Sequence, residues 1–314
     1  MQTSTTLVRH YDAATAPRGM FKHLEPILGY PGVVWEHRNL VFNFYRRELL
    51  GRFRGSMLGS FWVLIQPMFM FLVYFMVFGV LFGQQKWGEP PDPNFAFYLF
   101  SGMISFQAVN EGTSNNCGSI VGNANLVKKV AFPSEVLPIP GTLVTIVVYL
   151  VGVLVFLLAW GVCQLFGLST PAIQPGWMLL LLPLTLVVQF AMILGIGLFL
   201  ANLNVFARDV KMLWQIFTMG WLFLSPVFWM PYIMEGRMGD TLSQVLFHAN
   251  PVFPLIMAQR ITLGATDAVV ASGHTVQFGS FWVHMAVASV WSVFFLLLGY
   301  ALFMSRKHKY ADLV

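Results

Sequence analysis

Six long stretches of the chain are almost free of charged side chains, and each is close to or above the roughly 20 residues that an α-helix needs to cross a bilayer. Charged residues make up only 10% of the 314 residues, against about 25% in an ordinary soluble domain. The sequence therefore predicts an all-α integral membrane protein with about six transmembrane helices and no separate soluble domain. The expected spans are residues 57–82, 95–115, 136–166, 177–203, 211–230 and 281–304.

The segments that flank the first predicted span are polar or mixed in character. Residues 1–32 are polar and lack the apolar core and cleavage site of a signal peptide. Residues 33–56 mix apolar with basic side chains, which favours an amphipathic helix in the membrane interface, anchored by Trp35. An ordinary cytoplasmic linker helix is the alternative interpretation of this second segment.

The predicted transmembrane domain covers residues 57–304 and is followed by a short tail, 305–314. Before its last span, residues 231–264 have intermediate polarity and contain Pro251 and Pro254. Prolines interrupt helices, so we expect short re-entrant or interfacial helices here, with the two prolines at their breaks.

The distribution of basic residues predicts the orientation. With six spans and both termini in the cytoplasm, all but three of the 18 Lys and Arg residues fall on the cytoplasmic side, as the positive-inside rule requires. The three exceptions are Lys86, Arg237 and Arg260. Membrane topology explains the formal charge of +5, so nucleic-acid binding is not needed to account for it.

The sequence offers little chemistry for driving transport or catalysis by itself. No Gly-Lys dipeptide occurs, so there is no phosphate-binding loop of the GxxxxGK[ST] type. Glu111 and His284 lie near the ends of predicted spans, as end-of-helix residues do, and they make a poor proton path. The seven histidines are scattered, and Cys117 and Cys163 form no CxxC pair, so no metal or catalytic cluster is indicated. A passive pathway driven by another chain is the remaining option.

Several motifs resemble those of ABC-2 type permeases that export polysaccharides. Residues 46–68 read RRELLGRFRGSMLGSFWVLIQPM, similar to the family pattern in which a basic interface helix runs into an RYRGS-like motif and a proline in the first span. Residues 123–139 and 206–211 resemble the family's two cytoplasmic coupling segments. Residues 224–231 and 250–264 resemble the end of its fifth span and the segment before its last span.

This resemblance implies a homodimeric permease in the bacterial inner membrane, with two copies of a separate ABC ATPase bound on the cytoplasmic side. ATP and Mg²⁺ would be held by that partner, with no cofactor on this chain. The substrate would be a polysaccharide on an undecaprenyl-type lipid carrier, with O-antigen the first choice. Capsule or teichoic acid, a drug or a lipid are alternative cargoes, and a membrane glycosyltransferase, an acyltransferase or a secondary flippase are alternative functions.

Four groups of residues are candidates for these roles. Docking on the ATPase is expected of Asn123, Asn125, Lys128, Lys129, Arg208 and Asp209. A substrate entrance is expected at Arg46, Arg47, Arg52 and Arg54, where the guanidinium groups would meet the pyrophosphate of the carrier. Anchoring of the membrane topology is an equal alternative role for these arginines. Aromatic side chains at helical spacing are candidates for a sugar-lined channel, although helix packing is an equal alternative: Phe71, Phe75, Phe78, Phe82, Trp214, Phe217, Trp221 and Phe228. Pro251 and Pro254 would mark an outer gate.

Overall fold

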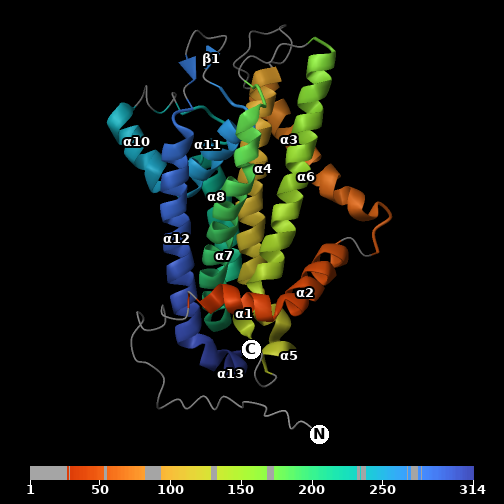
Figure 1. Cartoon of the computed structure of the whole chain (residues 1–314), viewed down its shortest axis with the longest axis vertical. Coiled ribbons are helices and arrows are strands. Elements are labelled where there is room, and N and C mark those ends of the chain that lie inside the picture. The colour runs from red at the N-terminus through yellow and green to blue at the C-terminus, as the bar shows by residue number, and fades with distance from the viewer. Residues whose placement is uncertain are drawn as a thin grey trace.

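The computed structural model is a bundle of long, roughly parallel helices with short helices packed at both ends (Figure 1). It describes residues 27, 29–52, 55–81, 93–128, 133–167, 173–231, 234, 238–266, 268–269, 275–276 and 278–314. Three of the described helical segments are long and apolar enough to cross a membrane, namely Ser134–Leu165, Trp177–Phe206 and Phe281–Leu313. The chain is thus an all-α membrane protein, as the sequence predicts.

Four helices make up the centre of the bundle. They are α4 (Pro93–Cys117), α6 (Pro138–Leu165), α7 (Leu182–Phe206, preceded by a 3-10 turn, Trp177–Leu181) and α12 (Phe281–Arg306). At 1.5 Å per residue, the 25 residues of α4 extend about 38 Å, enough for the roughly 30 Å hydrocarbon core. This helix packs against both α6 and α7, so the second predicted span is a central helix of the fold.

The outer face of α6 shows how the bundle meets the lipid. Leu150, Leu154, Leu158 and Val162 recur every four residues and are all exposed. Residues four apart lie on one face of a helix, and an exposed apolar stripe of this kind suits the hydrocarbon of a bilayer.

Two glycines allow a close approach of the backbones of α7 and α12. A β-carbon at Gly299 would overlap the carbonyl oxygen of Gly195, and one at Gly195 would overlap the backbone of Leu296. Small residues let the backbones of membrane helices approach closely. This glycine contact fixes how α12, the last span, sits on α7.

The first and fifth predicted spans are shorter α-helices than the sequence indicates. The first, α3 (Trp62–Tyr74), begins five residues after the predicted start and continues as a π-helical segment, Phe75–Leu81. The fifth, α8 (Val210–Leu224), ends six residues before the predicted end. Ser225 is extended there (φ −92°, ψ 142°) because the residue before a proline, here Pro226, is pushed out of the helical region.

The short helices at one end of the bundle include both ends of the described chain (Figure 1). The predicted interface helix is two helices, α1 (Tyr30–Glu36) and α2 (Arg38–Gly51), which break at His37. Beside them lie α5 (Ala124–Val127) and the C-terminal α13 (Tyr310–Leu313).

The opposite end carries the predicted gate segment and a small hairpin. The gate consists of α10 (Asp240–Ala249) and α11 (Val252–Thr262). The hairpin pairs β1 (Ala268–Val269) with β2 (Thr275–Val276) in antiparallel fashion, and these two strands of two residues each are a small exception to the helical fold.

Candidate functional site

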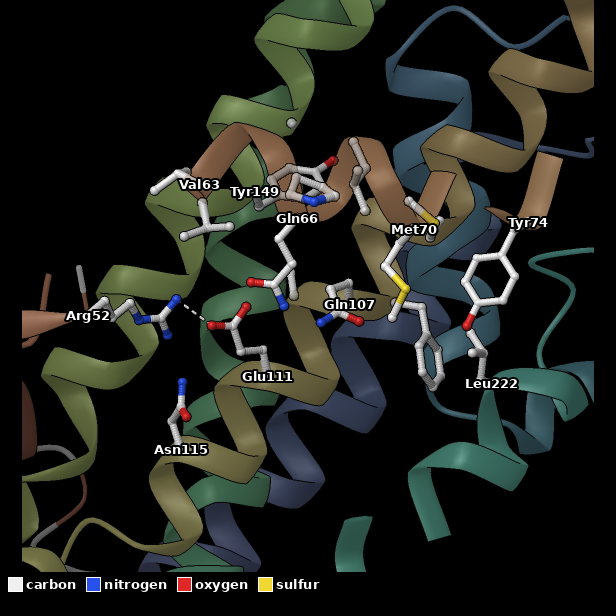
Figure 2. Close-up of a pocket in the computed structure, with 17 residues that line it drawn as sticks. Arg52, Val63, Gln66, Met70, Tyr74, Gln107, Glu111, Asn115, Tyr149 and Leu222 are labelled. Atoms are coloured by element: carbon white, nitrogen blue, oxygen red, sulfur yellow. Dashed lines mark ion pairs between the residues drawn. The ribbon is translucent and has the colours of Figure 1, made fainter. Parts of the chain in front are cut away.

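A cavity of about 330 Å³ lies between α3, α4 and α6 (Figure 2). This volume is at the lower end of the range for small-molecule pockets, about 300–1,000 Å³. Two stripes of residues spaced four apart face each other across it: Gln66, Met70 and Tyr74 from α3, and Gln107, Glu111 and Asn115 from α4. Because residues at i and i+4 lie on one side of a helix, each helix presents a single stripe to the cavity.

An ion pair stands at one end of the cavity. The Arg52 guanidinium, just after α2, contacts the Glu111 carboxylate of α4, and both side chains are about a fifth to a quarter exposed. Figure 2 shows Gln66 on the same side of the cavity, while Met70, Tyr74 and Leu222 lie at the other end. Glu111 is therefore more than an end-of-helix residue, because it ties the interface helix to the centre of the bundle.

Reversing one charge of this pair should destabilise the protein. In Arg52→Glu two carboxylates would face each other, and we expect a loss of about 1–2 kcal/mol, between the values for exposed and buried pairs. The double variant Arg52→Glu/Glu111→Arg should regain most of that loss, whereas Arg46→Glu, on the exposed side of α2, should change little. Thermal denaturation in detergent measures all three. Equal stability of Arg52→Glu and the double variant would show that the pair contributes nothing.

The predicted substrate entrance is only partly free to bind an anion. Arg46 is exposed, and Arg47 is exposed but donates to the Asn123 side-chain oxygen at 2.9 Å and lies 4.6 Å from the Phe44 ring centroid. The charge of Arg52 is neutralised by Glu111, and Arg54 lies outside the described residues. Of the three arginines that the structure describes, only Arg46 makes no hydrogen bond or ion pair with the described residues, since Arg47 and Arg52 are engaged by Asn123 and Glu111.

The acidic residue of α2, Glu48, has its side chain turned toward the helix bundle. Glu48 is half-buried beside α6, and one of its carboxylate oxygens lies near Gly141. Burial raises the pKa of the Glu48 carboxyl above its ordinary value, although the positive charges of Arg52 and Arg47 oppose this. This end of α2 is thus attached to the bundle through both its acidic and its basic side chains.

The two predicted docking loops meet at the same end of the bundle as α2. Asn125 and Lys128 are exposed on and beside α5, and Arg208 and Asp209 are exposed between α7 and α8. The ammonium nitrogen of Lys211, near the start of α8, comes close to Gly118, which follows α4. Asn123 bonds to the Ser119 carbonyl and accepts from Arg47, and Lys129 lies outside the described residues.

Several contacts made by the C-terminal residues and by Tyr30 stabilise this end of the fold, and no local sequence pattern predicts them. The Lys307 ammonium is 2.5 Å from the Glu135 carboxylate, and the Tyr30 hydroxyl donates to the Glu135 carbonyl at 2.9 Å. The Tyr310 hydroxyl contacts the Asn202 side-chain oxygen of α7 at 3.0 Å. Because these partners are about 100 or more residues apart, no local pattern links them.

The candidate channel aromatics form two packed groups. Phe71 stacks on Phe75 with ring centroids 5.6 Å apart. Trp214, Phe217 and Trp221 lie against one another on α8 with centroids 5.2–5.9 Å apart. Of these five, only Phe217 is more than half exposed.

The last aromatic candidates are less available to a substrate. Phe228 is buried in the core, beyond the end of α8, with its ring 4.6 Å from that of Tyr74. The side chain of Phe78 and the whole of Phe82 lie outside the described residues. Helix packing therefore accounts for Phe228.

The predicted gate breaks at one proline and not at the other. Asn250, directly before Pro251, is extended (φ −81°, ψ 112°), which ends α10 and starts α11. Pro254 sits in the first turn of α11, where a backbone N–H has no partner within the helix in any case, so it causes no break. The Asn250 side chain joins this break to α8, because its oxygen accepts from Trp221 Nε1 at 2.9 Å and its nitrogen donates to Ser225 at 3.0 Å.

Arg260, which is predicted to lie on the outer side of the membrane within the short helices before the last span, is a buried residue. It is 1% exposed in α11. Its guanidinium donates to the carbonyl oxygens of Pro226, Tyr98 and Val227 at 2.7, 3.2 and 3.3 Å, and it lies 3.6 Å from the Tyr98 ring centroid. No carboxylate of the described chain pairs with it. Arg260 thus holds the end of α8 against α4 and α11.

Within the described residues, no group of three or more His, Cys, Asp or Glu side chains gathers as a metal site would require.

A family model described as "ABC-2 type transporter" matches residues 39–263. The chain is 26% identical to the "O-antigen export system permease protein RfbA" of Myxococcus xanthus over 223 residues, which cover 71% of this chain and 79% of that protein. Two proteins of the same name from Klebsiella pneumoniae are 23% and 21% identical over 217 residues each, covering 68% of this chain and 76% of theirs. The family match runs from α2 to the residue after α11, so it includes the cavity, both loops and Arg260.

Proposed function

Because the chain belongs to the ABC-2 type transporter family, we propose that this permease is the membrane subunit of an ABC exporter that carries a lipid-linked polysaccharide across the bacterial inner membrane. The main support for the proposal is the similarity to three proteins named O-antigen export permeases. Each of them aligns with about 70% of this chain. O-antigen is accordingly the first choice of cargo. ATP and Mg²⁺ belong to a separate ATPase, since this chain has no phosphate-binding loop.

The proposed assembly is a homodimer with two ATPase copies on the end that carries α1, α2, α5 and α13 (Figure 1). Exposed basic side chains at that end include Arg46, Arg47, Lys128 and Arg208, and the positive-inside rule places such an end in the cytoplasm. The two predicted docking segments lie at that end, where Lys211 comes close to Gly118. A movement of either segment caused by the ATPase would be transmitted directly to α4, α7 and α8.

A charge reversal in the first loop should weaken ATPase binding. We expect Lys128→Glu to lower co-purification of the genetically adjacent ATPase at least tenfold, because it places a carboxylate where a cation is exposed for docking. The matched control is Arg38→Glu, an equal charge change on an exposed residue at the start of α2. The measurement is affinity co-purification in detergent, with the amount of inserted permease determined in parallel. Equal losses in both variants would show that docking at this loop is wrong.

A further inference from the structure

We propose that the cavity between α3, α4 and α6 is a sugar-binding site that holds one unit of the glycan during export. The proposal rests on the proposed function, because it names the part of the substrate that this site receives. The lining combines a neutral polar end with an apolar end (Figure 2). Sugars present the same combination of hydroxyl groups and CH faces.

The charge of the lining argues against an anionic ligand. Arg52 and Glu111 are its two charged members among the described residues, and they pair with each other. A phosphate or diphosphate would have to break this pair and would then meet the Glu111 carboxylate. An unneutralised carboxylate repels such a ligand and costs binding free energy. A neutral polyol leaves the pair intact.

The polar end has hydrogen-bonding groups that the protein itself does not use. The side-chain amides of Gln66, Gln107 and Asn115 make no hydrogen bond with the described residues, and each amide has donors as well as an acceptor. Pro67, also in the lining, has no N–H for the Val63 carbonyl four residues earlier in α3. A ligand with several hydroxyl groups, each both donor and acceptor, matches this set.

A buried tyrosine adds a second, independent observation. Tyr149 of α6 lines the cavity and is 2% exposed, and the Ser105 hydroxyl is the polar side chain beside its own hydroxyl. Ser105 donates its proton to the Ser101 carbonyl at 2.7 Å, so it is able to accept from Tyr149 but not to donate to it. The oxygen of the Tyr149 hydroxyl therefore has no donor among the described residues, and a sugar hydroxyl can supply one.

The apolar end suits the carbon-bound hydrogens of a sugar ring. Met70, Tyr74, Met103 and Leu222 line it, and mostly apolar linings with a few placed polar groups are typical of small-molecule sites. The volume of about 330 Å³ limits occupancy to a short stretch of glycan, not a coiled polymer. A site of this size holds the chain locally while the rest of the glycan lies elsewhere.

The test is saturation-transfer NMR on the full-length permease in nanodiscs. The probes are the oligosaccharides that mild acid releases from the source organism's own lipid-linked glycans, and inorganic diphosphate as the headgroup mimic. We expect transfer to the sugar protons and an apparent affinity about threefold to tenfold lower in Gln107→Leu and in Tyr149→Phe, as the loss of one or two hydrogen bonds predicts. Gln244→Leu, on the exposed face of α10, is the matched control and should bind as the wild type does.

Tyr149→Phe removes a single oxygen and keeps the ring, so it guards against a loss caused by misfolding. Sugar binding that is absent, or that is equal in all variants, would overturn the proposal. Diphosphate that displaces the sugar in the wild type but not in Arg52→Gln would also overturn it, and would identify a headgroup site. Association with the ATPase is measured on the same preparations, so failure of the sugar site is distinguishable from failure of the transporter assignment.

Discussion

Gly299→Ala should prevent the permease from forming a stable fold. The added β-carbon would overlap the Gly195 carbonyl oxygen, and the obstacle is backbone that cannot rotate away. We expect a loss of about 3 kcal/mol or more, at or beyond the top of the usual range of about 1–3 kcal/mol for overpacked cores. Fluorescence-detected size-exclusion chromatography after heating measures the loss as a lower temperature of aggregation and a smaller monodisperse peak.

Gly161→Ala supplies the matched control for this prediction. Gly161 lies inside α6, and a β-carbon there would meet nothing within 4 Å. The same substitution should be neutral or stabilise the helix by up to about 1 kcal/mol, since alanine is the better helix former. If both variants behave alike, the contact between α7 and α12 does not depend on the absence of side chains.

Arg260→Met should disrupt the end of the bundle opposite α2. The substitution keeps a long apolar stem but removes the donor to the Val227 carbonyl and one of two donors to the Tyr98 and Pro226 carbonyls, which keep the Ser101 and Tyr98 hydroxyls. An unsatisfied buried polar group costs about 1–3 kcal/mol, and the lost contact with the Tyr98 ring adds to this, so we expect a loss of about 2–3 kcal/mol. Thermal denaturation in detergent should show the loss, and proteolysis should cleave the segment after α8 faster than in the wild type.

Two further variants test whether the guanidinium contacts cause that loss of stability, and a third variant is the control. Arg260→Lys retains a cation with three donors and should recover part of the stability. Gly102→Ala should reproduce part of the loss, because its β-carbon would overlap the Arg260 guanidinium. Arg208→Met, which removes an exposed cation, should leave stability unchanged. A wild-type melting curve for Arg260→Met would mean that water or lipid satisfies these carbonyls equally well.

Local patterns in the sequence predict the long helices well, because apolar runs and prolines act over a few residues. The third, fourth and sixth predicted spans correspond to helices that begin and end within a few residues of the expected positions. The fifth ends early because one proline, Pro226, forces Ser225 into an extended conformation. Pro226 lies within a continuous apolar run, and the run taken by itself predicts a longer helix.

The site was harder to predict because its residues come together only through packing. Gln66, Gln107 and Tyr149 lie on three helices, and no spacing along the chain relates them. A lone arginine is normally exposed, so the burial of Arg260 depends on carbonyls that become available only where α8 ends. The i, i+4 stripe of Gln107, Glu111 and Asn115 is the one local signal that marks α4 as the polar wall of a cavity.

The most direct test of the transport assignment follows the glycan in cells of the source organism that lack this chain but retain the ATPase. We predict that the lipid-linked polysaccharide is still made but stays on the cytoplasmic side of the inner membrane, inaccessible to a sugar-oxidising enzyme added to spheroplasts. A plasmid copy of the wild-type permease should restore its accessibility, while Gly299→Ala should not. Polysaccharide that reaches the outer side without this chain, or that is no longer synthesised, would contradict the account.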